Sequence, residues 1–131
     1  MIKYHIVPRK KPGTTEVKWY AAPKRQGVVL LNDLAEEMAL ESTITEHDIK
    51  AVISSLQQHI IKHLKNGNSV RLGDLGSFHI TMSGSGSEVK KEYVLRQNLK
   101  AVRVQFSKSA RFLRAFNLKT GNLQFEQIDA A

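Results

Sequence analysis

The sequence predicts an α+β fold, in which two helices precede a three-stranded antiparallel sheet and a short last helix follows it. The prediction rests on the spacing of apolar residues along the 131-residue chain. They repeat at helical spacing between about residues 30 and 65, and they alternate with polar residues at 68–82 and 101–106. Clusters of glycine, serine and asparagine separate these segments.

Residues 1–27 are predicted to form a β-hairpin extension. Apolar and polar residues alternate at 2–6 and again at 17–21, and the intervening PRKKPGTT is rich in turn-forming Pro and Gly. We expect this hairpin at 1–27, the main domain at 28–118 and a C-terminal tail at 119–131. Leu123 and Phe125 suggest a short strand in that tail.

Two helices are predicted next. The first covers about residues 30–40, where apolar residues follow an i, i+3, i+4, i+7 pattern. The second begins at Thr45, whose spacing to Asp48 resembles a capping box, and ends near Gly67. Its apolar stripe consists of Ile49, Val52, Ile53, Leu56, Ile60 and Leu64.

The stretch NSVRLGDLGSFHI, residues 68–80, predicts two strands joined by a tight Gly-Asp-Leu-Gly turn, and 101–106 predicts a third strand. Alternation places the apolar residues of all three strands on one face, which the helices are expected to cover. The opposite face, called the polar face below, contains no acidic residue. It comprises Ser69, Arg71, Ser77, His79, Thr81, Arg103 and Gln105.

Residues 83–100 are too long for a tight turn between the second and third strands, so we expect them to project as an arm. The arm begins with SGSGS, which predicts a flexible tip. Its basic residues are Lys90, Lys91, Arg96 and Lys100.

Charge is segregated along the chain. The net charge of +8 divides into +6 over residues 1–25, −3 over 26–67, zero over 68–82, +6 over 83–114 and −1 over 115–131. Two basic segments around an acidic one favour a polyanionic partner, with nucleic acid ahead of an acidic membrane. The sequence contains no run of about 18 apolar residues, so no membrane-spanning helix is predicted. The chain has no cysteine, which excludes disulfides and thiolate metal sites.

Other site classes have little support. His59 and His63 have the i, i+4 spacing of zinc ligands, but Ile60 stands where a metalloprotease has Glu and no third ligand is evident. We therefore predict no metal and no cofactor. The SGSGS segment lacks the Gly-Lys-Ser/Thr of a phosphate loop, and no nucleophile elbow is present, so we expect no enzyme activity.

These elements together resemble the bacterial histone-like family, the HU and integration-host-factor type of DNA-binding protein, over about Leu30–Phe116. The family's glycine-rich signature is matched by Gly67, Gly73 and Gly76 followed by Ser77-Phe78, with Asp74-Leu75 as a departure. The basic arm, KAVRVQF and the short basic helix complete the resemblance. Residues 1–27 fit the subgroup with an N-terminal extension.

The resemblance implies an HU-like, nucleoid-associated architectural protein of the bacterial cytoplasm. It would be an intertwined homodimer that holds double-stranded DNA between two arms. The implied partners exclude membranes and small-molecule substrates. The DNA-binding residues would be Arg71, Ser77, His79, Thr81, Lys90, Lys91, Arg96, Lys100, Arg103, Gln105, Lys108 and Arg111.

The arm departs from the family in one chemical respect. Family members kink DNA with prolines near the arm tips, whereas all three prolines here, Pro8, Pro12 and Pro23, lie in the extension. We therefore expect modest bending. The altered tip also leaves an alternative open, in which the chain keeps the HU fold as a protein-interaction or assembly module without binding DNA.

Overall fold

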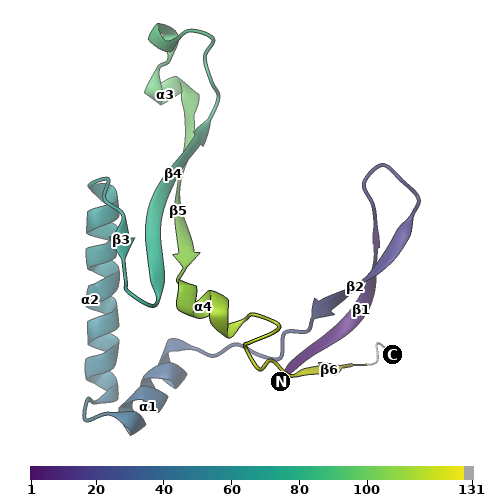
Figure 1. Ribbon diagram of the computed structural model, residues 1–131. Helices are drawn as coiled ribbons and strands as arrows, with labels where there is room; N and C mark the ends of the chain where they lie inside the picture. The colour runs from purple at the N-terminus through teal and green to yellow at the C-terminus, as the bar shows by residue number, and fades with distance from the viewer. Residues whose placement is uncertain (129–131) are drawn as a thin grey trace. The chain divides into compact units, whose positions relative to one another are not determined.

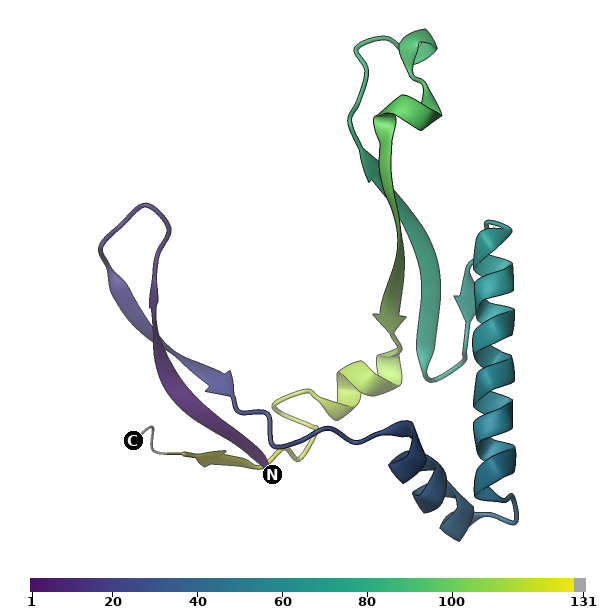
Figure 2. The ribbon, with the colours of Figure 1, turned by 180° about the vertical axis from the view of Figure 1, so that it is seen from behind.

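The computed structural model describes residues 1–128, which form two compact units. One unit contains Met1–Leu30 and the chain from Arg114 onward, and the other contains Leu31–Leu113. Figures 1 and 2 show the elements of each unit from opposite sides. The α+β class and the N-terminal hairpin predicted from the sequence are both confirmed.

The first unit is a three-stranded sheet in the order β2-β1-β6. Strands β1 (Ile2–Lys10) and β2 (Val17–Pro23) form the predicted antiparallel hairpin. Strand β6 (Phe125–Gln127) pairs with β1 in parallel, with Ile2 opposite Phe125. The tail thus contains a strand that includes Phe125 but not Leu123.

The second unit begins with two helices joined by a short connection (Figure 1). Helix α1 spans Leu31–Glu41 and helix α2 spans Glu46–Lys65, within a residue or two of the predicted limits. The Thr45 hydroxyl accepts a hydrogen bond from the Asp48 N–H at 3.2 Å, which is the predicted N-cap. At the other end Gly67 adopts a φ of +84°, as a left-handed helix stop requires.

The sheet of this unit has the order β3-β4-β5 and is antiparallel throughout. Its strands are β3 (Val70–Arg71), β4 (Gly76–Gly84) and β5 (Leu99–Lys108), and α2 lies beside β3 (Figure 2). Phe78 is opposite Phe106, with their ring centroids 4.9 Å apart. The next pairs along the same face are Ile80 with Val104 and Met82 with Val102.

A short helix, α4 (Ala110–Ala115), follows β5. Ser109 precedes it, and the Ser109 hydroxyl accepts a hydrogen bond from the Phe112 N–H at 3.5 Å. The same hydroxyl donates to the backbone carbonyl oxygen of Asp74. This second bond ties the start of α4 to the turn between β3 and β4.

The arm is more structured than the sequence predicted. Strands β4 and β5 stay paired as far as Gly84 and Leu99, and residues 85–98 form the tip. The tip contains a 3₁₀ turn, η1 (Lys90–Glu92), and a helical turn, α3 (Leu95–Asn98). The tip therefore differs from the predicted SGSGS, because Ser83 and Gly84 belong to β4 and the two turns lie beyond this segment.

Asn98 connects the two sides of the tip. Its side-chain oxygen accepts a hydrogen bond from the Val94 N–H at 3.0 Å. Its amide nitrogen donates to the carbonyl oxygens of Ser85 at 3.3 Å and Gly86 at 3.4 Å. One amide side chain thus supplies both donors and an acceptor to a loop that has no strand ladder.

Little apolar surface is buried within a single chain. Among the described residues only Ala35, Ile49 and Leu64 are buried hydrophobic side chains. On β5, Val104 is 59% exposed and Phe106 is 49% exposed, and Val52 and Leu56 of the α2 stripe are also exposed. The helices of a single chain therefore leave these residues of the apolar face uncovered.

Gly76 provides a test of the β4–β5 register. Its φ is +148°, and a Cβ atom there would lie 2.4 Å from the Ser107 carbonyl oxygen and 2.7 Å from the Phe106 ring. Gly76→Ala should therefore lower the free energy of unfolding by about 2 kcal/mol or more. Gly86→Ala is the matched control, because a Cβ at Gly86 would have no neighbour within 4 Å. Denaturant unfolding at one protein concentration measures both, and equal effects would contradict the close packing described for Gly76.

Candidate nucleic-acid interface

The polar face is assembled by the pairing of β4 with its two neighbours. Ser77 is opposite Arg71 of β3 and opposite Ser107 of β5. Further along β4, His79 is opposite Gln105 and Thr81 is opposite Arg103. Because opposed residues of a strand pair project to the same side, these side chains share one face of the sheet. The structure thus brings six of the predicted site residues together, namely Arg71, Ser77, His79, Thr81, Arg103 and Gln105.

The polar face is electropositive because it has two cations and no anion. The strands β3, β4 and β5 contain no Asp or Glu at any position. Arg71 and Arg103 are exposed, whereas Ser77 and His79 are half-buried. Around the guanidinium groups, hydroxyl, imidazole and amide side chains offer hydrogen bonds of either polarity. Such a surface suits phosphate oxygens, which only accept hydrogen bonds.

Ser107 is a member of this face that the sequence reasoning missed. It is paired with Ser77 and so extends the hydroxyl groups across two strands. The alternation that predicted Arg103 and Gln105 also contains Ser107, two residues further along. The strand predicted from the sequence covers 101–106 and ends one residue before Ser107.

Three of the four basic residues of the arm lie at its tip and not on the sheet. Lys90 and Lys91 belong to η1, and Arg96 belongs to α3. All three are exposed. Lys100 lies at the start of β5, where its ammonium group donates to the Gln97 carbonyl oxygen at 3.4 Å. The tip also contains Glu88 and Glu92, so its positive charge is partly offset.

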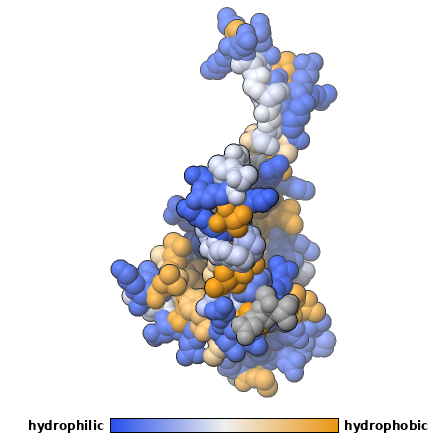
Figure 3. Space-filling view, turned by 90° about the vertical axis from the view of Figure 1, so that its right-hand side faces the viewer, coloured by the Kyte–Doolittle hydropathy of each residue, from blue (hydrophilic) through white to orange (hydrophobic). Residues whose placement is uncertain are grey.

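The arm tip also exposes apolar side chains, which are Val89, Tyr93, Val94 and Leu95. Figure 3 shows the end of the arm, at the top of the view, as mostly hydrophilic with hydrophobic residues among the polar ones. Leu95 belongs to α3, and the other three residues flank η1 and α3.

Besides the basic residues of the arm, two more predicted site residues lie off the polar face. Lys108 is opposite Gly76, which places it on the side of Phe78 and Phe106 at the end of β5. Arg111 is an exposed residue of α4. Neither residue shares the face of the sheet on which strand pairing places Arg71 and Arg103.

Within residues 1–128, no group of three or more His, Cys, Asp or Glu side chains is arranged to hold a metal ion. His59 and His63 are both exposed on α2. No helix in this part of the chain has the length and apolar character needed to cross a membrane.

Known structures share this fold. A crystal structure of a protein from Bacteroides vulgatus, provisionally described as a bacterial DNA-binding protein, matches with a TM-score of 0.69 and 11% identity. That match covers 99% of this chain and 50% of the Bacteroides protein, so the chain spans about half the length of that protein. An Anabaena HU–DNA cocrystal structure matches with a TM-score of 0.51 and 19% identity, covering 66% of this chain and 95% of the HU chain.

The sequence itself gives a family assignment. No curated protein matches the chain. The model of one family, described as an HU domain fused to a wHTH, Ig or glycine-rich motif, matches residues 1–124. This match includes the N-terminal hairpin and nearly the whole chain, and it confirms the resemblance to HU found in the sequence. The chain belongs to the family of HU domains fused to wHTH, Ig or glycine-rich motifs.

Proposed function

We propose that the protein is an architectural DNA-binding protein that contacts duplex DNA through the polar face of β3–β5 and through the arm. The observation that carries the proposal is the acid-free face of the sheet, on which strand pairing places both Arg71 and Arg103. Membership of an HU family and the fold shared with an HU–DNA cocrystal structure support it.

The mechanism is electrostatic. Arg71, Arg103 and the basic residues of the arm neutralise phosphates and release condensed counterions, which supplies affinity without reading base sequence. Ser77, Thr81 and Gln105 hydrogen-bond to the backbone and fix the position of the duplex. The arm follows the minor groove, and binding is largely independent of sequence. This activity places the protein on the nucleoid in the bacterial cytoplasm.

The working form is a homodimer. A three-stranded sheet with an exposed apolar row of Val102, Val104 and Phe106 is not a stable surface in water. The α2 stripe is incompletely covered as well. A second copy of the chain supplies the missing apolar surface, so that Ile53, Leu56, Ile60 and Phe78 lie in a shared core.

Arg103 tests the DNA contact. Arg103→Glu should weaken binding to unrelated duplexes alike, by roughly ten- to a hundredfold, because a charge-assisted hydrogen bond is lost and a repulsion gained. Thermal stability should stay nearly unchanged, since Arg103 is exposed. Lys62→Glu is the matched control, as it makes the same charge change on exposed α2. Fluorescence anisotropy with two duplexes of different sequence measures the affinity of each variant. Equal losses of affinity in Arg103→Glu and Lys62→Glu would contradict a DNA contact through the polar face.

Val104 tests the dimer. Val104→Asp should dissociate or unfold the protein, because the apolar face of β5 then places a charge in the shared core. Val28→Asp is the control, since Val28 is 70% exposed and lies outside both sheets. Sedimentation velocity at micromolar concentration should show a dimer for the wild type and for Val28→Asp only. A stable folded wild-type monomer under these conditions would refute the shared core.

A further inference from the structure

The N-terminal sheet has two chemically different faces. The β1–β2 register puts Ile2, Tyr4 and Ile6 of β1 on the same side as Trp19 and Ala21 of β2. Phe125 of β6 joins them opposite Ile2, and its ring packs edge-on against Tyr4 at 6.4 Å. The other face is called the basic face below. Its basic residues are Lys3, His5, Arg9, Lys18 and Lys24, the last held beside Lys3, and it also contains Val7, Tyr20 and Glu126.

Arg9 and Lys18 are directly opposite each other on the basic face. Like charges in opposed positions of antiparallel strands are destabilising, so an anion between them would be stabilising. Within residues 1–128, neither side chain forms an ion pair with a carboxylate. The Arg9 guanidinium lies 5.7 Å from the centroid of the Tyr20 ring, a cation–π contact that orients it.

A hollow of about 440 Å³ lies at this end of the hairpin. It is lined by Arg9, Lys10, Lys11, Pro12, Lys18 and Tyr20. Four of these six residues are cationic and none is acidic. The tyrosine hydroxyl adds a hydrogen-bond donor, so every polar side chain of the hollow can donate to an anion.

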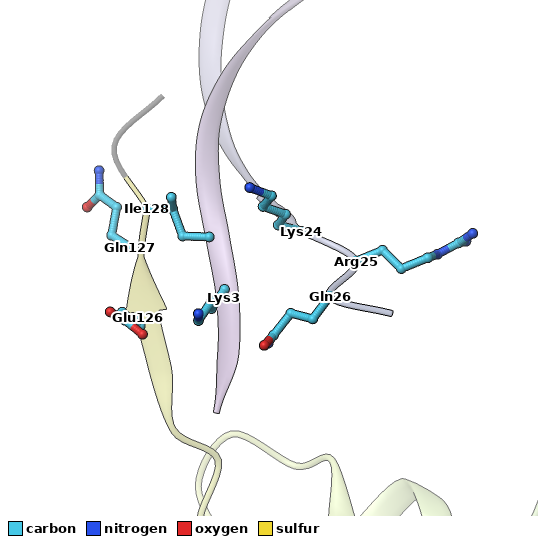
Figure 4. Close-up of a pocket in the computed structure, with 7 residues that line it drawn as sticks. All are labelled: Lys3, Lys24, Arg25, Gln26, Glu126, Gln127 and Ile128. Atoms are coloured by element: carbon cyan, nitrogen blue, oxygen red, sulfur yellow. The ribbon is translucent and has the colours of Figure 1, made fainter. Parts of the chain in front are cut away.

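A second hollow, of about 570 Å³, lies at the other end of the same sheet. Its cations are Lys3, Lys24 and Arg25, and its one acid is Glu126 of β6 (Figure 4). The backbone N–H of Lys24 donates to the Lys3 carbonyl oxygen at 2.8 Å, which keeps these two lysines adjacent. In Figure 4, Arg25 extends away from Lys3 and Glu126.

The spacing of the two hollows suits a long polyanion. Lys3 and Arg9 are six residues apart on β1, about 20 Å at the rise of a β-strand. Duplex DNA advances about 3.4 Å per base pair, so this distance matches about six base pairs. An anionic membrane fits less well, because Ile2, Ile6 and Trp19 lie on the face opposite Arg9 and Lys18.

We propose that the basic face of the N-terminal sheet is a second contact surface for duplex DNA. It adds phosphate contacts through Arg9, Lys18 and Lys24 to those made by the polar face of β3–β5. This inference rests on the proposed function, since the ligand is the same duplex. Two surfaces on one chain raise the affinity even where each binds weakly, because binding through one surface holds the other at a high effective concentration near the same duplex.

The test compares three full-length variants on a 30-base-pair duplex across a salt series. The first is Arg9→Gln/Lys18→Gln/Lys24→Gln. The second, Lys50→Gln/Lys62→Gln/Lys65→Gln, removes the same charge from α2. The third, Arg9→Lys/Lys18→Arg/Lys24→Arg, conserves charge. Fluorescence of Trp19, the single tryptophan, reports whether the hairpin remains folded in each variant.

The slope of log K against log salt is negative, and each lost phosphate contact reduces its magnitude by about 0.9. In the first variant the magnitude of the slope should therefore fall by about 2 to 3 per chain. The α2 variant and the charge-conserving variant should keep the wild-type slope. Equal slopes in the first variant and the α2 variant would overturn the inference and leave the proposed function standing. A wild type that does not bind duplex would overturn both.

Vesicles containing phosphatidylserine test the alternative of a membrane ligand. Weak wild-type binding to these vesicles at 150 mM salt is expected. If the first variant instead lost vesicle binding while its duplex slope stayed at the wild-type value, the basic face would be a membrane surface and the DNA inference would be wrong.

Discussion

The pairing of Phe78 with Phe106 is the interaction on which the second unit depends. Side chains alternate along a strand, so this one pairing decides which residues lie on each face of β4 and β5. It puts Ile80, Val104 and Met82 on the apolar side. It puts Thr81 and Arg103 on the side proposed to contact DNA. A shift of one residue would exchange the two faces and remove both properties at once.

Close backbone contacts hold this register at both ends of the β4–β5 ribbon. At the base, Gly76 lies so near the Ser107 carbonyl that no side chain fits there. At the arm, a Cβ on Gly84 would lie 2.1 Å from the Asn98 carbonyl oxygen, and the register shifts between Ser83 and Gly84. Beyond this point the Asn98 side chain replaces the strand ladder with hydrogen bonds to Ser85, Gly86 and Val94. The arm is thus an ordered extension of the sheet.

The sequence predicted the features that depend on local periodicity. Alternation assigned Arg103 and Val104 to opposite faces, and the Thr45–Asp48 spacing located the start of α2. It did not reveal the pairing of β6 with β1, since Phe125 and Ile2 are far apart in the chain and three residues give little periodic signal. The turns of the arm tip were missed because SGSGS dominated the local composition, while the Asn98 hydrogen bonds span more than ten residues. Lys108 was assigned to DNA by its charge, although its parity in β5 places it with Phe106.

The salt dependence of duplex binding tests the central claim most directly, because an electrostatic contact to phosphates has a signature that no other mechanism shares. The affinity of the wild-type protein for a random-sequence duplex should fall log-linearly with salt. About six to ten neutralised phosphates would reduce it by about 10³–10⁵ between 50 and 200 mM salt. A nearly flat dependence, or no measurable binding to duplex at 50 mM salt, would contradict the account.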